Sequence, residues 1–159
     1  MALVKGTNSY VTVAEANTFF ADRLDVAAWL AADDASKAQA LVTATSVLDD
    51  QRWIGTAIGE SQPLAFPRSA YYFDPRLGTQ IMLDQSVVPD RIVTATMHLA
   101  HHLLTNDGLL DDTGQVQDLQ VGSVSLTNVT APSLIPGVVR RLIKPLLVNS
   151  GSHGWWRAN

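Results

Sequence analysis

The sequence predicts a mainly α-helical fold, an antiparallel bundle of about four helices with a β-hairpin or extended β arm and a flexible C-terminal tail. Long stretches repeat apolar residues at helical spacing, one segment near residue 120 alternates as a strand does, and the final residues combine Gly and Ser with paired tryptophans. A chain of 159 residues that is 47% hydrophobic can bury one core. We expect a single domain over residues 1–147, with a loop insertion at 56–87, a β extension at 116–129 and a tail at 148–159.

Two helices are predicted in the first third of the chain. Thr12 and Glu15 have the spacing of a capping box, which predicts a helix over residues 13–24 with Leu24 on its buried side. A longer amphipathic helix is predicted from about residue 35 to residue 53. Two such helices need a further apolar surface to pack against.

The best helix in the chain is predicted over residues 88–104. Pro89 favours a first helical turn, and neither Gly nor Pro follows until Gly108. At 100° per residue its apolar stripe comprises Ile92, Ala95, Thr96, Leu99 and Leu103. We expect this stripe to be the centre of the bundle.

The same helix carries His98, His101 and His102. We place His98 and His102 on one flank and His101 on the opposite side, so the three cannot close on one ion. No glutamate in this helix could serve as a general base in the manner of an H-E-x-x-H motif. We therefore expect no metal site, and a metal-dependent enzyme using His98 and His102 would require bound metal in the purified protein.

The insertion at 56–87 is predicted to be an ordered loop, because its aromatic residues are too apolar for water. Pro63 and Pro67 exclude a helix there. Arg68 and Arg76 are interpreted as intramolecular braces, with an anion site as the alternative.

Charge is unevenly distributed along the chain. Residues 1–131 hold all 15 acidic residues and seven of the 11 basic ones, a balance of −8, whereas residues 132–159 hold four basic residues and no acid. An acidic body is not typical of a protein that coats nucleic acid. The N-terminal residues and the lack of a long apolar run predict a soluble, unsecreted protein without a membrane partner.

The chain contains no cysteine and none of the motifs of a nucleotide cradle or an esterase elbow. Its paired aspartates lie at predicted helix ends or in a loop, where capping and solvation account for them. We therefore expect no catalytic residue, no cofactor and no enzymatic activity.

Two segments near the C-terminus are predicted to reach a partner. Residues 116–129 alternate as a hairpin or an extended arm, which needs either the bundle or a strand edge of a neighbouring copy; its key residues are Val121, Gly122, Val124 and Leu126. A last helix begins at Pro136, and the tail beyond it ends in Trp155 and Trp156. That pair either folds back on its own bundle or anchors the tail in a partner's pocket.

Several pieces in this order resemble one family. The pieces are Tyr10-Val11-Thr12-Val13 with Glu15-Ala16, Lys37 with Leu41, Ala44 and Leu48, Trp53 with Gly55, the stretch Q-P-L-A-F-P-R from Gln62 to Arg68, Val88-Pro89 with Ala95, Leu99 and Ala100, and Val121-Gly122-Ser123-Val124. Together they resemble the head-tail adaptor (connector or head-completion) proteins of tailed bacteriophages, a family that includes members labelled DnaT-like single-stranded-DNA-binding proteins. The likeness covers residues 9–147.

The resemblance implies a homo-oligomeric ring, usually of twelve copies, beneath the portal in the neck of the virion. Such a ring continues the DNA channel without binding DNA specifically, and it docks the tail or the next neck protein. The C-terminal segment would reach the portal through Arg140, Arg141, Lys144, Trp155, Trp156 and Arg157. The β extension would pair between subunits or face the tail.

The alternative function is binding of single-stranded DNA. That function needs a basic groove with stacking aromatic rings. In the sequence the candidates are Tyr71, Tyr72 and Phe73 beside Arg68 and Arg76.

Overall fold

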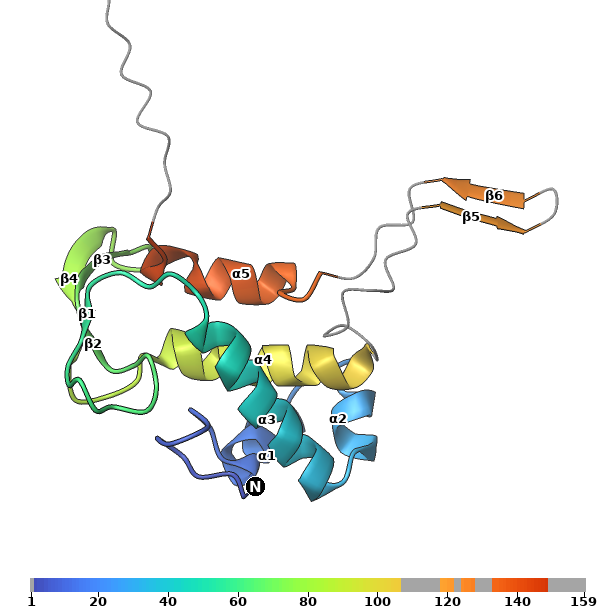
Figure 1. Ribbon diagram of the computed structural model, residues 1–159, viewed down its shortest axis with the longest axis horizontal. Coiled ribbons are helices and arrows are strands. Elements are labelled where there is room, and N and C mark those ends of the chain that lie inside the picture. The colour runs from blue at the N-terminus through green and yellow to red at the C-terminus, as the bar shows by residue number, and fades with distance from the viewer. Residues whose placement is uncertain (1, 107–117, 122–123, 128–132, 149–159) are drawn as a thin grey trace, which may run out of the picture.

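A computed structural model describes residues 2–106, 118–121, 124–127 and 133–148 (Figure 1). The helices in this part are α1 (Val13–Ala21), α2 (Ala27–Ala31), α3 (Asp34–Asp49), α4 (Asp90–Thr105) and α5 (Gly137–Ile143), and α5 continues into the 3-10 turn η2 (Lys144–Leu146). The strands are β1 (Thr56–Ala57), β2 (Arg68–Ser69), β3 (Tyr71–Asp74), β4 (Thr79–Met82), β5 (Asp118–Val121) and β6 (Val124–Thr127).

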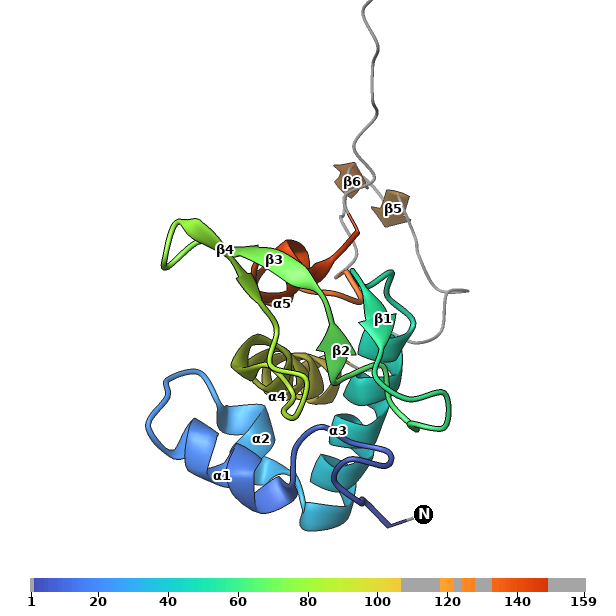
Figure 2. The same cartoon turned by 90° about the vertical axis from the view of Figure 1, so that its left-hand side faces the viewer.

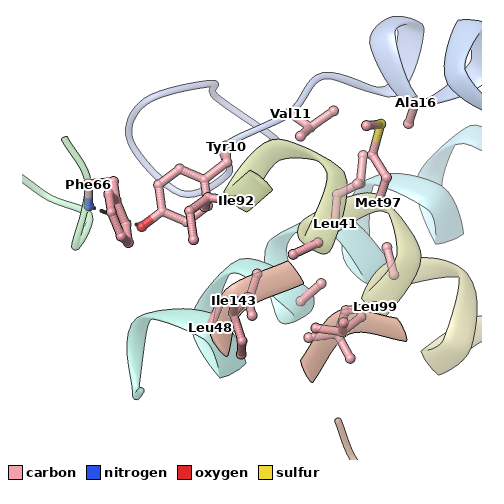
Figure 3. Close-up of a cluster of buried hydrophobic side chains, with 14 of the residues drawn as sticks. Tyr10, Val11, Ala16, Leu41, Leu48, Phe66, Ile92, Met97, Leu99 and Ile143 are labelled. Atoms are coloured by element: carbon pink, nitrogen blue, oxygen red, sulfur yellow. Dashed lines mark hydrogen bonds between the residues drawn. The ribbon is translucent and has the colours of Figure 1, made fainter. Parts of the chain in front are cut away.

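Helix α4 lies at the centre of the molecule, as its pattern predicts. It packs against α3 and α5 and also contacts α2, and Figures 1 and 2 show α5 on one side of it and α1 and α2 on the other. Ile92, Ala95 and Leu99 are fully buried, and Figure 3 shows Ile92 and Leu99 among core side chains from α3 and α5. The predicted stripe is confirmed, with Leu103 only half-buried at its end.

The predicted fold class is wrong, because the chain is mixed α/β and not a mainly α-helical bundle. The insertion at 56–87 contains four short strands: β1 pairs antiparallel with β2, and β3 pairs antiparallel with β4 across the turn at Gly78. Tyr71, Tyr72 and Phe73 are all aromatic, so the alternation of exposed and inward-facing positions in β3 is hidden from a hydropathy pattern. The insertion was therefore predicted to be an ordered loop.

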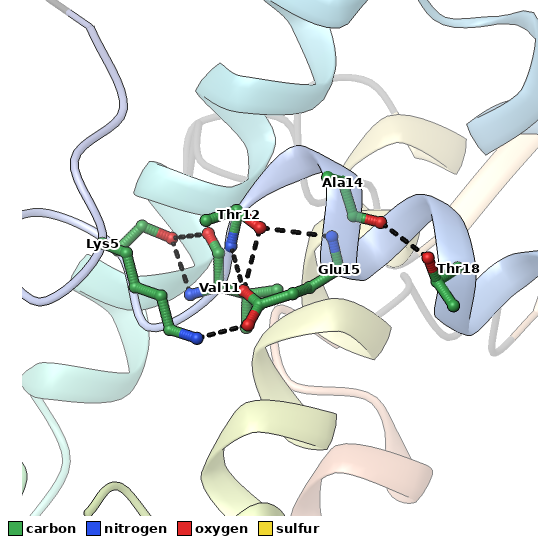
Figure 4. Close-up of polar contacts among 7 residues, drawn as sticks. Lys5, Val11, Thr12, Ala14, Glu15 and Thr18 are labelled. Atoms are coloured by element: carbon green, nitrogen blue, oxygen red, sulfur yellow. Dashed lines mark hydrogen bonds and ion pairs between the residues drawn. The ribbon is translucent and has the colours of Figure 1, made fainter.

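The start of α1 has the capping box that the sequence predicts. The Thr12 hydroxyl accepts from the Glu15 N–H at 3.2 Å, and the Glu15 carboxylate accepts from the Thr12 N–H at 2.8 Å. Figure 4 shows Lys5 reaching the same carboxylate, which holds the pKa of Glu15 below its usual value. The helix ends at Ala21, and the prediction that Leu24 is buried is wrong, because its side chain is 92% exposed.

A polar cluster joins three distant parts of the chain inside the core. The Tyr10 hydroxyl donates to the Asp49 carboxylate at the end of α3 and accepts from the Phe66 N–H at 3.2 Å. The second Asp49 oxygen accepts from the Ala65 N–H at 3.2 Å. Burial raises the pKa of the Tyr10 hydroxyl, and its bond to Asp49 raises it further. The cluster fixes the insertion on α3, and Figure 3 shows its bond between Tyr10 and Phe66.

The predicted hairpin within 116–129 is confirmed, because β5 and β6 pair antiparallel with Leu119 opposite Leu126 and Val121 opposite Val124. Figure 1 shows the pair lying apart from the helices. In the part of the chain that the structure describes, each of these strands pairs only with the other.

Candidate binding face

Strand β3 presents two aromatic rings to solvent. Tyr71 and Phe73 are 69% and 54% exposed, whereas Asp74 is buried and Tyr72 is half-buried. This order follows from the two-residue period of a strand, which sends positions 71 and 73 to the same face. Exposed aromatic rings on one face of a hairpin are a surface on which a planar group can stack.

Helix α5 and η2 present three cations. Val139, Ile143 and Leu146 are buried against the core, and the exposed positions between them carry Arg140, Arg141 and Lys144. The spacing of the buried residues orients the helix, so the basic residues face solvent. Among the residues that the structure describes, none of these three forms an ion pair with an acid.

Two exposed rings and one of the cations, Tyr71, Phe73 and Lys144, meet at one cleft of about 390 Å³. Tyr71, Phe73 and Gln80 line it from the β3–β4 hairpin, and Lys144 and Pro145 line it from η2. We call the surface formed by Tyr71, Phe73, Arg140, Arg141 and Lys144 the cationic–aromatic face. Figure 2 shows β3 and α5 side by side on the same side of α4. The face therefore combines stacking groups with positive charge.

Of the candidates that the sequence offers for a groove that binds single-stranded DNA, Tyr71 and Phe73 lie on this face, whereas Arg68 and Arg76 do not. Arg68 is a brace, as predicted, because its guanidinium donates to the carbonyls of Ile54, Ala65 and Gly55 at 2.7–3.2 Å. The cation that shares the cleft with Tyr71 is instead Lys144, although the two residues are far apart in the sequence. Only the packing of η2 beside β3 reveals this neighbour.

Arg76 is also a brace within the hairpin. Its guanidinium donates to the buried Asp74 carboxylate at 3.2 Å, and Arg91 from α4 approaches the same group at 3.7 Å. The bond from Arg76 holds the pKa of Asp74 down at about 2. The Tyr72 hydroxyl donates to this carboxylate as well. Asp74 thus ties the hairpin to α4 and stays ionised at neutral pH.

The histidines of α4 do not lie as the sequence analysis places them. His98 and His101 both pack against the Phe20 ring, with centroids 6.5 and 5.6 Å away, so His101 is not on the opposite side. Three residues turn a helix by 300°, which is only 60° in the other direction. Burial lowers the pKa of both imidazoles. His102 Nε2 lies 2.8 Å from the Ser133 carbonyl oxygen, and in the described residues no three potential ligands gather around a metal position.

The other predicted contact residues fall partly outside the described residues. Arg140 and Arg141 are exposed on α5 and Lys144 is exposed on η2, while Trp155, Trp156 and Arg157 lie outside the described residues. Val121 belongs to β5, and Val124 and Leu126 belong to β6. Gly122 lies outside the described residues, so the role predicted for these positions remains a prediction.

The fold and the face define a small mixed α/β domain with a binding surface and a detached hairpin. A family model described as "Putative DnaT-like ssDNA binding protein" matches residues 2–158. The chain belongs to this family. No curated protein and no solved structure matches the sequence. None of the described helices is long and apolar enough to cross a membrane.

Proposed function

We propose that the protein binds single-stranded DNA through the cationic–aromatic face. The observation that carries this proposal is the placement of Tyr71 and Phe73 beside Lys144 at one cleft. The description of the family supports the same function. It replaces the adaptor role as the first candidate, because a stacking surface next to unpaired cations has the two parts that single-strand binding requires.

Bases would stack on the exposed rings while phosphates meet the cations of α5. Stacking on an aromatic side chain contributes roughly 1–3 kcal/mol per base and is tolerant of sequence. Three phosphate contacts give a slope of about −2 for log K against log salt, since each contact contributes about −0.7 on single strands. Binding would therefore be weak to moderate, salt-dependent and without strong base preference.

The test is a fluorescence anisotropy titration of the full chain with a labelled oligothymidine at about 50 mM salt, where phosphate contacts are strong. The paired substitution Tyr71→Ala and Phe73→Ala removes both rings, and we expect Kd to rise at least tenfold. Lys144→Ala should weaken binding less and lower the salt slope by about 0.7.

Lys5→Ala is the control, because Lys5 is an exposed cation paired with Glu15 of α1. Helix α1 lies on the other side of α4 from α5 (Figure 1). It should leave the affinity unchanged. Wild-type protein that shows no salt-dependent binding, or ring variants that bind as the wild type does, would overturn the proposal.

A second candidate function is the head-tail adaptor of a tailed phage that the sequence resembles. The position of β5 and β6 apart from the helices favours it, because an isolated two-stranded hairpin is marginal in water and gains stability by pairing with another chain (Figure 1). In this role copies of the chain would form a ring in the virion neck without catalytic activity. The ring would contact the portal through Arg140, Arg141 and Lys144, and it would dock a tail or neck protein.

Co-expression with the portal protein of the same genome distinguishes the two functions. An adaptor should copurify with the portal as a particle whose mass is a fixed multiple of the subunit mass, and deletion of residues 118–127 should reduce that assembly. A single-strand binder should elute without the portal. Retention of the portal by the deletion variant at the wild-type level would contradict the role of the hairpin.

A further inference from the structure

The corner between α1 and α2 exposes two large apolar side chains. Leu24 is 92% exposed and Leu30 is 68% exposed, more than most large apolar residues in the described ranges. Leu24 lies beyond the last residue of α1, next to Asp25 with its positive φ of 58°, and Leu30 is exposed on α2 next to the buried Trp29. Exposed leucines so close in the chain indicate a surface that another molecule covers.

This corner is acidic. Its exposed carboxylates belong to Asp22, Asp25, Asp33 and Asp34. Two cations lie nearby: the Arg23 guanidinium is 3.4 Å from the centroid of the Phe19 ring, and the Lys37 ammonium, on a side chain only 12% exposed, is 3.9 Å from the Asp34 carboxylate, which itself is 84% exposed. We call residues 22–34 the acidic corner.

The acidic corner complements the cationic–aromatic face in charge and in apolar character. Figures 1 and 2 show the two surfaces on opposite sides of α4, so one molecule cannot bring its own pair together. A contact between two different surfaces of identical chains is heterologous, and repeated it gives a ring or a filament. The occupant that fits both surfaces is a second copy of the chain.

We propose that the acidic corner of one copy docks head to tail on the cationic–aromatic face of the next. Leu24 and Leu30 enter the cleft between Tyr71, Phe73 and Pro145. The aspartates face Arg140, Arg141 and Lys144. The contact would form whether or not the protein binds DNA, but it uses the same face, so single-stranded DNA and a second copy exclude each other.

Sedimentation velocity of the full chain over a range of concentrations tests the contact. We expect larger species to grow with concentration, to diminish with salt and to dissociate when oligothymidine is added. Replacing both leucines by Ser should weaken self-association at least tenfold. At protein concentrations too low for the wild type to self-associate, the same change should leave the affinity for oligothymidine unaltered, because the face is intact.

Charge reversal gives a sharper test. One variant carries Asp22→Arg and Asp34→Arg, and the other carries Arg140→Glu and Lys144→Glu; circular dichroism checks that both fold. Neither should associate alone, because each has two surfaces of the same sign. An equimolar mixture should associate again, because each corner then meets an oppositely charged face.

The outcomes separate this proposal from the proposed function. Wild-type protein that binds oligothymidine but sediments as a monomer at every concentration overturns the head-to-tail contact, as does a mixture of folded variants that fails to associate. Protein that self-associates as described but neither binds oligothymidine nor dissociates with it overturns DNA binding and leaves the contact standing.

Discussion

Removal of the Tyr10 hydroxyl is expected to destabilise the protein strongly. Tyr10→Phe keeps the ring, which is 1% exposed and packs edge-on against Phe66 at a centroid distance of 6.3 Å. It removes a hydrogen bond to the Asp49 carboxylate and the acceptor of the Phe66 N–H. A bond to a charged group contributes roughly 1.5–3 kcal/mol, and a buried donor left unpaired costs about 1–3 kcal/mol.

We therefore expect the free energy of unfolding to fall by about 2–4 kcal/mol in Tyr10→Phe. Urea unfolding followed by tryptophan fluorescence measures it, and with a slope near 2 kcal/mol per molar urea the midpoint should fall by about 1–2 M. Tyr71→Phe is the matched control, since the Tyr71 side chain is 69% exposed, and its midpoint should stay near that of the wild type.

The effect should depend on pH in a defined direction. Burial raises the pKa of Asp49 in the folded state, while the bond from Tyr10 lowers it. Loss of that bond raises the pKa further, so ionisation of Asp49 costs the variant more stability as pH rises through the raised value. The difference from wild type should be largest at neutral pH and should shrink as pH falls through the raised pKa of Asp49, because the carboxyl then protonates in both proteins. A loss below about 0.5 kcal/mol at neutral pH, or one that grows on acidification, would refute this account of the cluster.

Two further substitutions test how the insertion is held. Asp74→Asn should lower the free energy of unfolding at neutral pH and remove an acid transition. The ionised Asp74 carboxylate stabilises the wild type above the ordinary Asp pKa, and this stabilisation is lost as pH falls through about 2. Acid titration by circular dichroism measures both effects, and an unchanged profile would contradict the tie to α4. Gly55→Ala should destabilise the protein by several kcal/mol in thermal unfolding, because φ at Gly55 is +67° and a Cβ would lie 2.0 Å from the Ser69 carbonyl oxygen. A variant as stable as the wild type would show that β1 and β2 can separate at little cost.

Local signals in the sequence locate α1, α3, α4 and the β5–β6 hairpin, although α1 and α3 end earlier than predicted, and they are insufficient for the strands of the insertion. The capping box at Thr12 and the stripe through Ile92 and Leu99 are confirmed because they depend on residues three or four apart. Strands β1 and β2 are two residues long, and their pairing depends on the approach of Gly55 to Ser69, which no local pattern encodes. The fold class was wrong for that reason.

The candidate site divides in the same way. The cations near residue 140 and the aromatic run of β3 are visible in the sequence. That Lys144 lies beside Tyr71 and Phe73 depends on the tertiary packing of η2 against β3. Leu24 was predicted to be buried because its spacing continues the helix for one turn beyond Ala21. That error concerns the residue on which the proposed contact between copies depends.

Net charge alone misjudges what this surface can bind. The chain carries −4 overall, which argues against DNA, yet charges more than about 8–10 Å apart are largely screened at physiological salt. The acidic corner lies across α4 from the cationic–aromatic face (Figure 2), and Asp74 is offset by Arg76 and Arg91. A phosphate at the face would therefore interact mainly with Arg140 and Arg141 of α5 and with Lys144 of η2. The salt dependence of DNA binding should accordingly report about three local cations, with a slope near −2, and a slope near zero would mean that the distant acids govern the interaction after all.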